Sequence, residues 1–430
     1  MKQKHLPFIV LATMIIAGIV AGCGKDPIEP KPDPDPKDTT HQDTVTIDTD
    51  TVVIPVDSTI FIKWAGTSAT VEIDDKLADQ FTAEISGGHV VLTNPNITDE
   101  FLFVLSGTCE DGSFTYNGAF KTSFEFDNLN LTSTKGGAID IQCGKRIKLT
   151  LKDGSTNTLA DAAEGEQKAA FNCQGHLEVS GSGSLSVAGN FRHGLRTKEY
   201  LYLGSTAGSI SVTSAAADAI HCGEYFAMDG GELTISGMAG DGLQVETDPG
   251  SEEALNGQFI MNAGTINMTM TSPDSKGIRL DIDSVNKVTP EMNILGGTIN
   301  VNLTSAALGA KAIASDGNLT IGSSTTNPTI DVTVAAGVFK ETVNDTEEEN
   351  RATGIKADKT LTIAGGATTV TATGKKSRGV RAARLVAAGG TLTVKNTGSK
   401  SQGIKLDGPK TNADYYQETG GTVNCSNWKY

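Results

Sequence analysis

The stretch DAIHCGEYFAMDGGELTISGMAGDGLQVE, residues 218–246, contains one phrase twice. Asp-Ala-Ile at 218–220 returns as Asp-Gly-Leu at 241–243, which is 23 residues later. Between them a Gly-Gly pair precedes alternating polar and apolar residues, the pattern of a short, half-buried β-strand after a turn. A repeat at this spacing indicates a protein built from similar structural units.

The pair of a small residue and an apolar residue recurs along most of the chain, at spacings of 23 to 42 residues. The apolar members are Ile139, Phe171, Leu195, Ile220, Leu243, Ile278, Ile313, Ile355, Val380 and Ile404. A second apolar set comprises Ile147, Leu177, Leu201, Phe226, Phe259, Met292, Leu319 and Leu361. Three short strands per repeat predict an all-β, right-handed parallel β-helix, with turns about 4.8 Å apart and each apolar set forming an inward column. A β-propeller is the alternative, but its blades need about 40–45 residues.

The N-terminal segments differ from the repeats. Residues 1–22 hold two lysines and a short apolar run, which predicts a signal peptide. A small-residue site precedes Cys23, so we expect a lipoprotein acylated at Cys23 and anchored in the outer membrane of a Gram-negative bacterium, facing the cell surface. Residues 23–57 are rich in Pro, Asp and Thr, which predicts a disordered tether. We expect residues 58–128 to form a β cap and 129–430 to form the β-helix.

The composition limits the partners. The formal charge is −16, and it becomes −18 once Lys2 and Lys4 of the signal peptide are removed. An acidic chain excludes nucleic acid as the expected partner, because phosphates demand a basic surface, and it favours divalent cations. Five cysteines besides Cys23, without a short CxxC spacing, predict neither a zinc site nor a disulfide framework.

Acidic residues recur at the predicted corners. Asp218 and Asp241 occupy the same corner of successive turns, where two carboxylates about 5 Å apart repel by roughly 3 kcal/mol at an effective dielectric constant of about 20. Water, a raised pKa or a bound cation can offset this repulsion. A second acidic column contains Glu246 and Asp281, so we predict that these four residues bind Ca²⁺, which prefers oxygen ligands. The alternative is that each Asp caps its own turn.

Two outward columns predict a ligand surface. The residue after the inward aliphatic is often basic, and such a column can follow a polyanion such as a uronic-acid polymer; a solvated face is the alternative. A column of rings and cations precedes the second apolar column, and rings suit sugars, although mutual stacking would produce the same pattern. The candidate glycan-binding residues are Arg146, His176, Arg196, Tyr200, His221, Tyr225 and Arg279. Insertions such as FKETVNDTEEENR, residues 339–351, are further candidates, because binding often resides in loops.

With these motifs the chain resembles the carbohydrate-binding, polysaccharide-lyase-like β-helix lipoproteins of gut and soil bacteria. The resemblance runs from about Ser106 to Ser426 and rests on LSGTCEDGSF, GKRIKLTLKDGSTNTLAD, HLEVSGSGSLSVAGN and the stretch quoted above. It implies a right-handed parallel β-helix, bound calcium and affinity for cellulose-like or pectic glycans. The acids of DAI and GDGL match the corner motif of that family. The equivalent corners of other turns hold His193, Lys276, Lys311, Thr353, Arg378 and Gln402, so calcium is not expected there.

We therefore expect a monomeric cell-surface protein that binds acidic or cellulose-like polysaccharide with calcium, and a binder rather than an enzyme. The first alternative is a calcium-dependent, pectate-type lyase, in which Lys276 or Arg279 beside Asp281 acts as the base. The second is a structural adhesin that uses the stack as a rod. Sugar binding, an unsaturated product, or neither would distinguish the three.

Overall fold

The computed structural model describes residues 58–281, 289–343 and 346–430. The predicted signal peptide, the lipidated Cys23 and the tether lie outside these ranges. The described chain is all-β, with one 34-stranded, mostly parallel sheet and one two-stranded sheet. A 3-10 turn, Ala78–Gln80, is the one helical element that lies wholly within these ranges. In the same ranges no helix has the length and apolar content needed to cross a membrane.

The N-terminal end of the sheet consists of two antiparallel hairpins, and the pairing then becomes parallel. The hairpins are β1–β2 and β3–β4, while β1 also pairs in parallel with β5, β4 with β6, and β5 with β7. The bounds are β1 (Thr59–Gly66), β2 (Ser68–Glu72), β3 (Thr82–Ser86), β4 (Gly88–Asn94), β5 (Leu102–Cys109), β6 (Gly112–Gly118) and β7 (Thr122–Thr132). Phe103 and Phe124 stack in this region with ring centroids 5.2 Å apart, so aromatic packing fills this end of the core.

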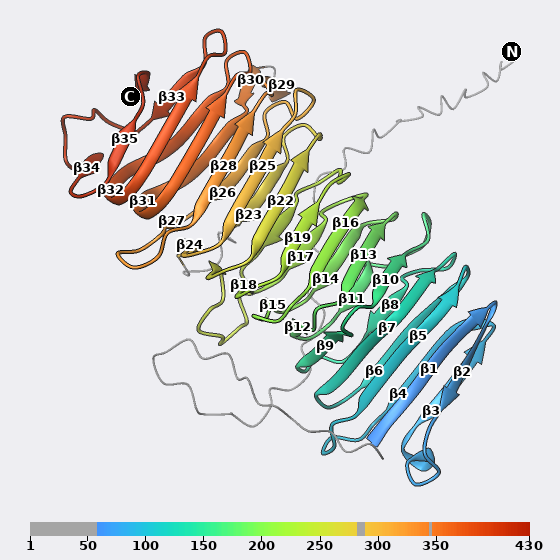
Figure 1. Ribbon diagram of the computed structural model, residues 1–430. Helices are drawn as coiled ribbons and strands as arrows, with labels where there is room; N and C mark the ends of the chain where they lie inside the picture. Colours follow the sequence, from blue (N-terminus) through green and yellow to red (C-terminus); the bar gives the residue numbers. More distant parts are fainter. Residues whose placement is uncertain (1–57, 282–288, 344–345) are drawn as a thin grey trace, which may run out of the picture. The chain divides into compact units, whose positions relative to one another are not determined.

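Most later strands pair in parallel with the strand three positions further along, which produces three ladders (Figure 1). The first ladder contains β8 (Ile139–Ile141), β11 (Ala169–Cys173), β14 (His193–Thr197), β17 (Ile220–Cys222), β20 (Leu243–Val245), β23 (Lys276–Leu280), β26 (Lys311–Ser315), β33 (Gln402–Lys405) and β36 (Trp428–Lys429). The second contains β9 (Ile147–Leu151), β12 (Leu177–Ser180), β15 (Leu201–Leu203), β18 (Tyr225–Met228), β21 (Gln258–Met261), β24 (Glu291–Ile294), β27 (Asn318–Ile321) and β34 (Tyr416–Glu418). The third contains β10 (Thr156–Ala160), β13 (Ser184–Gly189), β16 (Ser209–Ala215), β19 (Glu232–Ile235), β22 (Thr265–Met270), β25 (Thr298–Leu303), β28 (Thr329–Val334) and β35 (Thr422–Asn424). The long strands β31 (Thr353–Ala372) and β32 (Arg378–Asn396) take part in all three.

The strand register confirms both predicted apolar columns. Consecutive members of the first column, from Ile139 to Ile404, are Cα partners in the first ladder. Those of the second, from Ile147 to Leu361, are partners in the second ladder. Every member is at most 1 % exposed. A single turn has no partner for its apolar face, so stacking of the turns creates the core.

The small residue before each first-column member has a packing reason. A Cβ added to Gly242 would lie 2.5 Å from the Gly277 carbonyl oxygen, and one added to Gly277 would lie 2.5 Å from the Ala312 carbonyl oxygen. Where the chain has Ala instead, as at Ala219, the side chain is fully buried. The repeat keeps Gly or Ala here because a larger side chain would meet the backbone of the next turn.

The acidic insertion at 339–351 forms most of an antiparallel hairpin. Its strands are β29 (Val338–Val343) and β30 (Thr346–Arg351), which pair with each other and not with the large sheet. The hairpin leaves the stack between β28 and β31 and brings Glu349 and Arg351 beside the first ladder.

Candidate functional site

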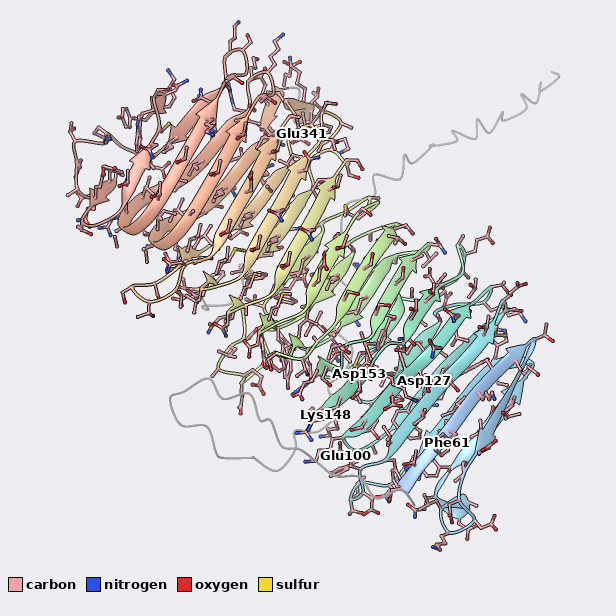
Figure 2. The ribbon with its side chains drawn as sticks, in the orientation of Figure 1. Phe61, Glu100, Asp127, Lys148, Asp153 and Glu341 are labelled. Carbon is pink, nitrogen blue, oxygen red and sulfur yellow. The ribbon has the colours of Figure 1, made fainter. Side chains whose placement is uncertain are left out.

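The corner acids join successive turns through hydrogen bonds. The side chains of Asp218 and Asp241 are buried, and the residues are 2 % and 5 % exposed. Asp218 Oδ1 accepts the Asp241 N–H at 2.7 Å, and Asp241 Oδ1 accepts the Lys276 N–H at 2.7 Å. Asp153, labelled in Figure 2, accepts the N–H of Ser182 in the next turn at 3.0 Å. Each acid therefore caps the following turn, whereas the sequence alternative had it capping its own.

Neighbouring side chains balance the charge of these acids. Arg279 Nη1 donates to Asp241 Oδ2 at 3.0 Å, and its Nη2 donates to Asp281 Oδ2 at 2.6 Å. On the other side, Asp218 Oδ2 lies 3.4 Å from His193 Nδ1 and 3.5 Å from His221 Nδ1. The repulsion that the sequence predicts between Asp218 and Asp241 is thus offset by a guanidinium and by backbone N–H groups.

The donors at the Asp218–Asp241 corner do not fit calcium. Calcium takes roughly six to eight oxygen ligands. Two imidazole nitrogens face Asp218, and a guanidinium bridges Asp241 and Asp281. The other predicted ligand, Glu246, accepts a hydrogen bond from Gln244 Nε2 at 2.9 Å and is the most exposed of the four.

The predicted tyrosine column is buried. Tyr200 and Tyr225 are 7 % and 4 % exposed, and their rings stack with centroids 4.4 Å apart at 21°. The Tyr200 hydroxyl donates to Glu178 Oε1 at 2.8 Å, and the His176 ring lies 4.4 Å from the Tyr200 ring. The structure therefore contains the mutual stacking that was the alternative interpretation of this column. Neither tyrosine offers an open ring face to a sugar.

The other predicted glycan-binding residues also have protein partners. Arg146 lies 3.6 Å from Glu100, and His176 makes a close contact with Glu199. Arg196 is buried and donates to Asn172 Oδ1 at 3.1 Å. Among the predicted set, Arg279 keeps a partly exposed side chain beside the basic column of the first ladder.

Two rows of basic residues run along the later turns of the first ladder. In one row, successive Cα partners are Arg279, Ala314, Lys356, Arg381 and Lys405. In the other, they are Lys276, Lys311, Thr353, Arg378 and Gln402. Members of both rows line the same cavity, so cations from neighbouring turns collect on one face.

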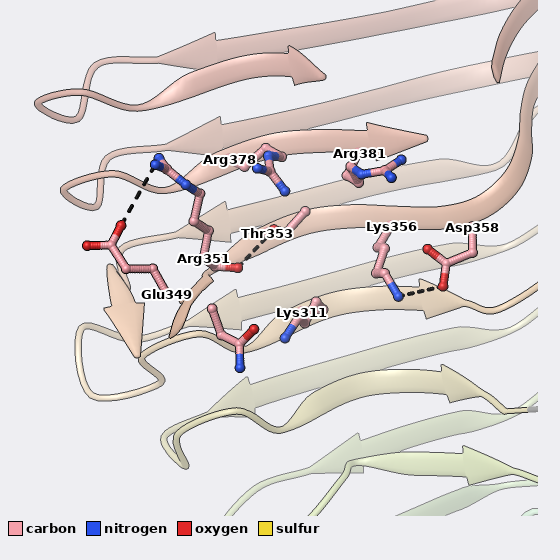
Figure 3. A pocket seen from close by; sticks show the side chains of 9 residues that line it. Lys311, Glu349, Arg351, Thr353, Lys356, Asp358, Arg378 and Arg381 are labelled. Atoms are coloured by element: carbon pink, nitrogen blue, oxygen red, sulfur yellow. Dashed lines mark hydrogen bonds and ion pairs between the residues drawn. The ribbon is translucent and has the colours of Figure 1, made fainter. Parts of the chain in front are cut away.

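A cavity of about 220 Å³ lies between these rows and the β29–β30 hairpin (Figure 3). We call it the cationic pocket. Its lining comprises Lys311, Arg351, Lys356, Arg378 and Arg381, together with Glu349, Asn350, Thr353 and Asp358. Lys356 donates to Asp358 at 2.7 Å, Lys311 donates to Asp274 at 2.9 Å, and Arg351 lies 4.0 Å from Glu349, so part of the charge is paired.

The positive charge of the cationic pocket is not fully balanced. Burial, and then the like charges of Arg351 and Arg381, lower the pKa of Arg378 to about 10. Burial, with a contribution from the neighbouring lysines, also lowers the pKa of Lys311. Arg381 Nη2 pairs with Asp407 Oδ1 at 2.8 Å, but its Nη1 is buried without a hydrogen-bond partner in the described chain. A carboxylate placed here would restore the favourable environment of these cations.

A family model of carbohydrate-binding domain-containing proteins matches residues 86–408. The chain belongs to this family. A carbohydrate-binding domain-containing protein of Acetivibrio thermocellus is 29 % identical over 126 residues, which cover 27 % of this chain and 43 % of that protein. The chain therefore matches less than half of that relative. A polysaccharide lyase-like protein from C. thermocellum, solved as a gadolinium derivative, aligns with a TM-score of 0.50 at 23 % identity, covering 62 % of this chain and 98 % of that one. This likeness shows a shared fold.

Sequence reasoning missed the cationic pocket of this carbohydrate-binding domain protein. Lys311 and Arg378 were noted only as corners without acids, and Arg351 was noted only as part of an acidic insertion. The sequence signal that could have revealed the pocket is that two basic columns, three residues apart in the sequence, occur on the same turns. The hairpin that closes the pocket had no such signal, because its sequence is rich in charged and polar residues.

Proposed function

We propose that this carbohydrate-binding domain protein binds an acidic polysaccharide along the two basic rows, with the cationic pocket as the central subsite. The observation that carries the proposal is the unbalanced charge at Arg378, which is partly buried beside Arg351 and Arg381. Guanidinium groups bind carboxylates through paired hydrogen bonds, so a uronic-acid unit fits this pocket chemically.

The repeat of the fold supports a polymeric ligand. Successive turns are about 4.8 Å apart, so the rows offer cations at regular intervals along the stack. The chain as a whole has a formal charge of −16 despite these rows, so its other surfaces repel a polyanion. Charge complementarity would thus confine an acidic glycan to this face.

The test is binding of polygalacturonate to wild type and to the double variant Arg378→Gln/Arg381→Gln. We expect the double variant to bind at least about tenfold more weakly, because two charge-assisted contacts are lost. Wild-type binding should weaken as salt increases, since the contacts are ionic. Calorimetry or affinity electrophoresis measures both effects.

A matched control removes the same charge elsewhere. Lys63 and Lys395 are exposed and lie outside the pocket, so Lys63→Gln/Lys395→Gln should bind within about twofold of wild type. Equal losses in both double variants would show that only net charge matters. Unchanged binding by Arg378→Gln/Arg381→Gln would remove the pocket from the proposal.

Calcium dependence stays a prediction. It is supported by the partly exposed carboxylates of Glu246 and Asp281, which can share an ion with a uronate and with water. Binding of polygalacturonate should then fall on addition of a calcium-selective chelator and return with calcium. Binding that is indifferent to the chelator would leave the basic rows as the sole source of affinity.

A calcium-dependent polysaccharide lyase is the second candidate. The observation in its favour is the lowered pKa of Lys311 in the cationic pocket, because a lysine that deprotonates more easily is a better base. A lyase would release unsaturated products that absorb in the ultraviolet, and Lys311→Met would abolish them. Polysaccharide binding without such products would support a binding protein. If the protein neither binds nor cleaves polysaccharide, the structural adhesin is the remaining candidate.

Two further predictions concern the chain as a whole. We infer that the three ladders wind as a right-handed parallel β-helix, supported by parallel pairing one turn apart and by the right-handed preference of parallel crossovers. We also propose that Cys23 carries a lipid that holds the protein on the outer-membrane surface, supported by the sequence before it. Cys23→Ser should then move the protein from the membrane fraction to the soluble fraction.

A further inference from the structure

The corner at Asp218 holds a cluster that the glycan proposal does not use. His193 begins β14 and His221 lies in β17, strands that pair in parallel in adjacent turns, and Asp218 immediately precedes β17. Asp218 Oδ2 lies 3.4 Å from His193 Nδ1 and 3.5 Å from His221 Nδ1. Ligand atoms of the three residues all lie within 4.8 Å of one another.

Both imidazole nitrogens that face Asp218 lack a hydrogen bond. The Nδ1 atoms of His193 and His221 are buried without a partner in the described chain, and His193 is only 3 % exposed. A buried polar atom without a partner is unfavourable, and this corner has two that face one carboxylate oxygen.

The distances fit a small, tetrahedrally coordinated ion. Two ligand atoms each about 2.1 Å from Zn²⁺ and separated by the tetrahedral angle lie about 3.4 Å apart. The two distances from nitrogen to oxygen at this corner are 3.4 and 3.5 Å. Two imidazoles and one carboxylate suit Zn²⁺ and related transition metals, whereas calcium prefers oxygen. We propose that His193, Asp218 and His221 bind a divalent transition-metal ion, with Zn²⁺ as the best fit.

The surrounding residues fix the orientation of the three ligands. The Asp241 N–H holds Asp218 Oδ1 at 2.7 Å, which directs Oδ2 toward the imidazoles. The outer nitrogen of His221, Nε2, faces Glu246 Oε2 at 3.8 Å, and Gln244 holds the other oxygen of Glu246 at 2.9 Å. A carboxylate behind a ligating imidazole selects its tautomer and increases its basicity. The ion would connect β14 to β17, two turns of the stack.

The experiment measures Zn²⁺ binding by the metal-free full chain, purified without a histidine tag. We expect about one Zn²⁺ per chain by calorimetry, a visible absorption band of tetrahedral Co²⁺ when cobalt replaces zinc, and no displacement by millimolar Ca²⁺. The double variant His193→Gln/His221→Gln should lose the cobalt band and bind Zn²⁺ at least about 100-fold more weakly. The matched control is His89→Gln, because His89 lies 3.3 Å from Asp111 without a second imidazole; it should bind as wild type does.

A measurement on wild type keeps the test valid if the double variant fails to fold. Nitrogen NMR of selectively labelled histidine should show the Nδ1 signals of two of the six histidines moving when Zn²⁺ is added. Absence of stoichiometric Zn²⁺ binding, binding that survives in a folded double variant, or shifts confined to other histidines would overturn the proposal. The glycan experiments alter Arg378 and Arg381, which lie in later turns of the same ladder than His193, Asp218 and His221, so either proposal can fail without the other.

Discussion

Glu224 is a buried acid whose charge opposes folding. It is 4 % exposed, and its Oε2 has no hydrogen-bond partner among the described residues. Burial, and then the negative charge of Glu199, raise the pKa of Glu224 from 4.5 to about 7. Between these values the folded state holds a proton that the unfolded state has released, so the free energy of unfolding decreases as pH rises through this window.

The variant Glu224→Gln should therefore be more stable than wild type at pH 8 by roughly 2–3 kcal/mol, and the difference should vanish near pH 4.5. Urea unfolding across this range measures it. The exposed Glu84→Gln is the control and should show no such trend. A stability difference that is independent of pH would mean that Glu224 gains no proton on folding.

Individual residues were predictable from sequence only in part. The residues that point into the core were predictable, because alternation and repeat length determine which side chains face inward. The side chains that face Asp218 were not predictable, because one of them, His193, comes from the preceding turn of the stack. Tyr200 and Tyr225 share one column whether they bind sugar or stack on each other. Their burial decides for mutual stacking, and burial cannot be read from the sequence.

At the scale of the strand, the close approach of neighbouring turns makes Gly277 irreplaceable. Its substitution by Ala would bring Cβ to 2.5 Å from the Ala312 carbonyl oxygen in β26, and a backbone atom of a paired strand has little room to move. We expect Gly277→Ala to destabilise the fold by about 1–3 kcal/mol. At Gly204 the nearest atom would be 3.3 Å away, so Gly204→Ala is the milder control. Denaturation midpoints compare the two, and an equal or larger effect at Gly204 would contradict this explanation.

The strands of the three ladders were predictable because each repeats a pattern that the core requires. The β29–β30 hairpin was not, since its sequence is acidic and has no apolar alternation. Its two strands pair with each other and not with the large sheet, so they add nothing to the repeating core pattern. The predicted insertion was nevertheless placed correctly in the chain, because repeat spacing reveals where extra residues enter even when it does not reveal their structure.

At the scale of the whole stack, the fold predicts how mutations combine. In a repeating structure each turn contacts mainly its neighbours, so stability is approximately a sum of terms for single turns and for adjacent pairs. Leu195 and Ile220 are direct Cα partners in the first column, whereas Ile355 is five turns from Leu195, roughly 24 Å along the stack.

Truncation of each of these residues to Ala removes a fully buried side chain and should cost about 2–5 kcal/mol. The costs of Leu195→Ala and Ile355→Ala should add to within about 0.5 kcal/mol, because no cavity or contact is shared. Leu195→Ala with Ile220→Ala should deviate from additivity by about 0.5–3 kcal/mol, since their cavities adjoin. Urea unfolding of the three single and two double variants gives both coupling energies. Strong coupling of the distant pair would mean that the stack unfolds as one rigid unit rather than through interactions between neighbouring turns.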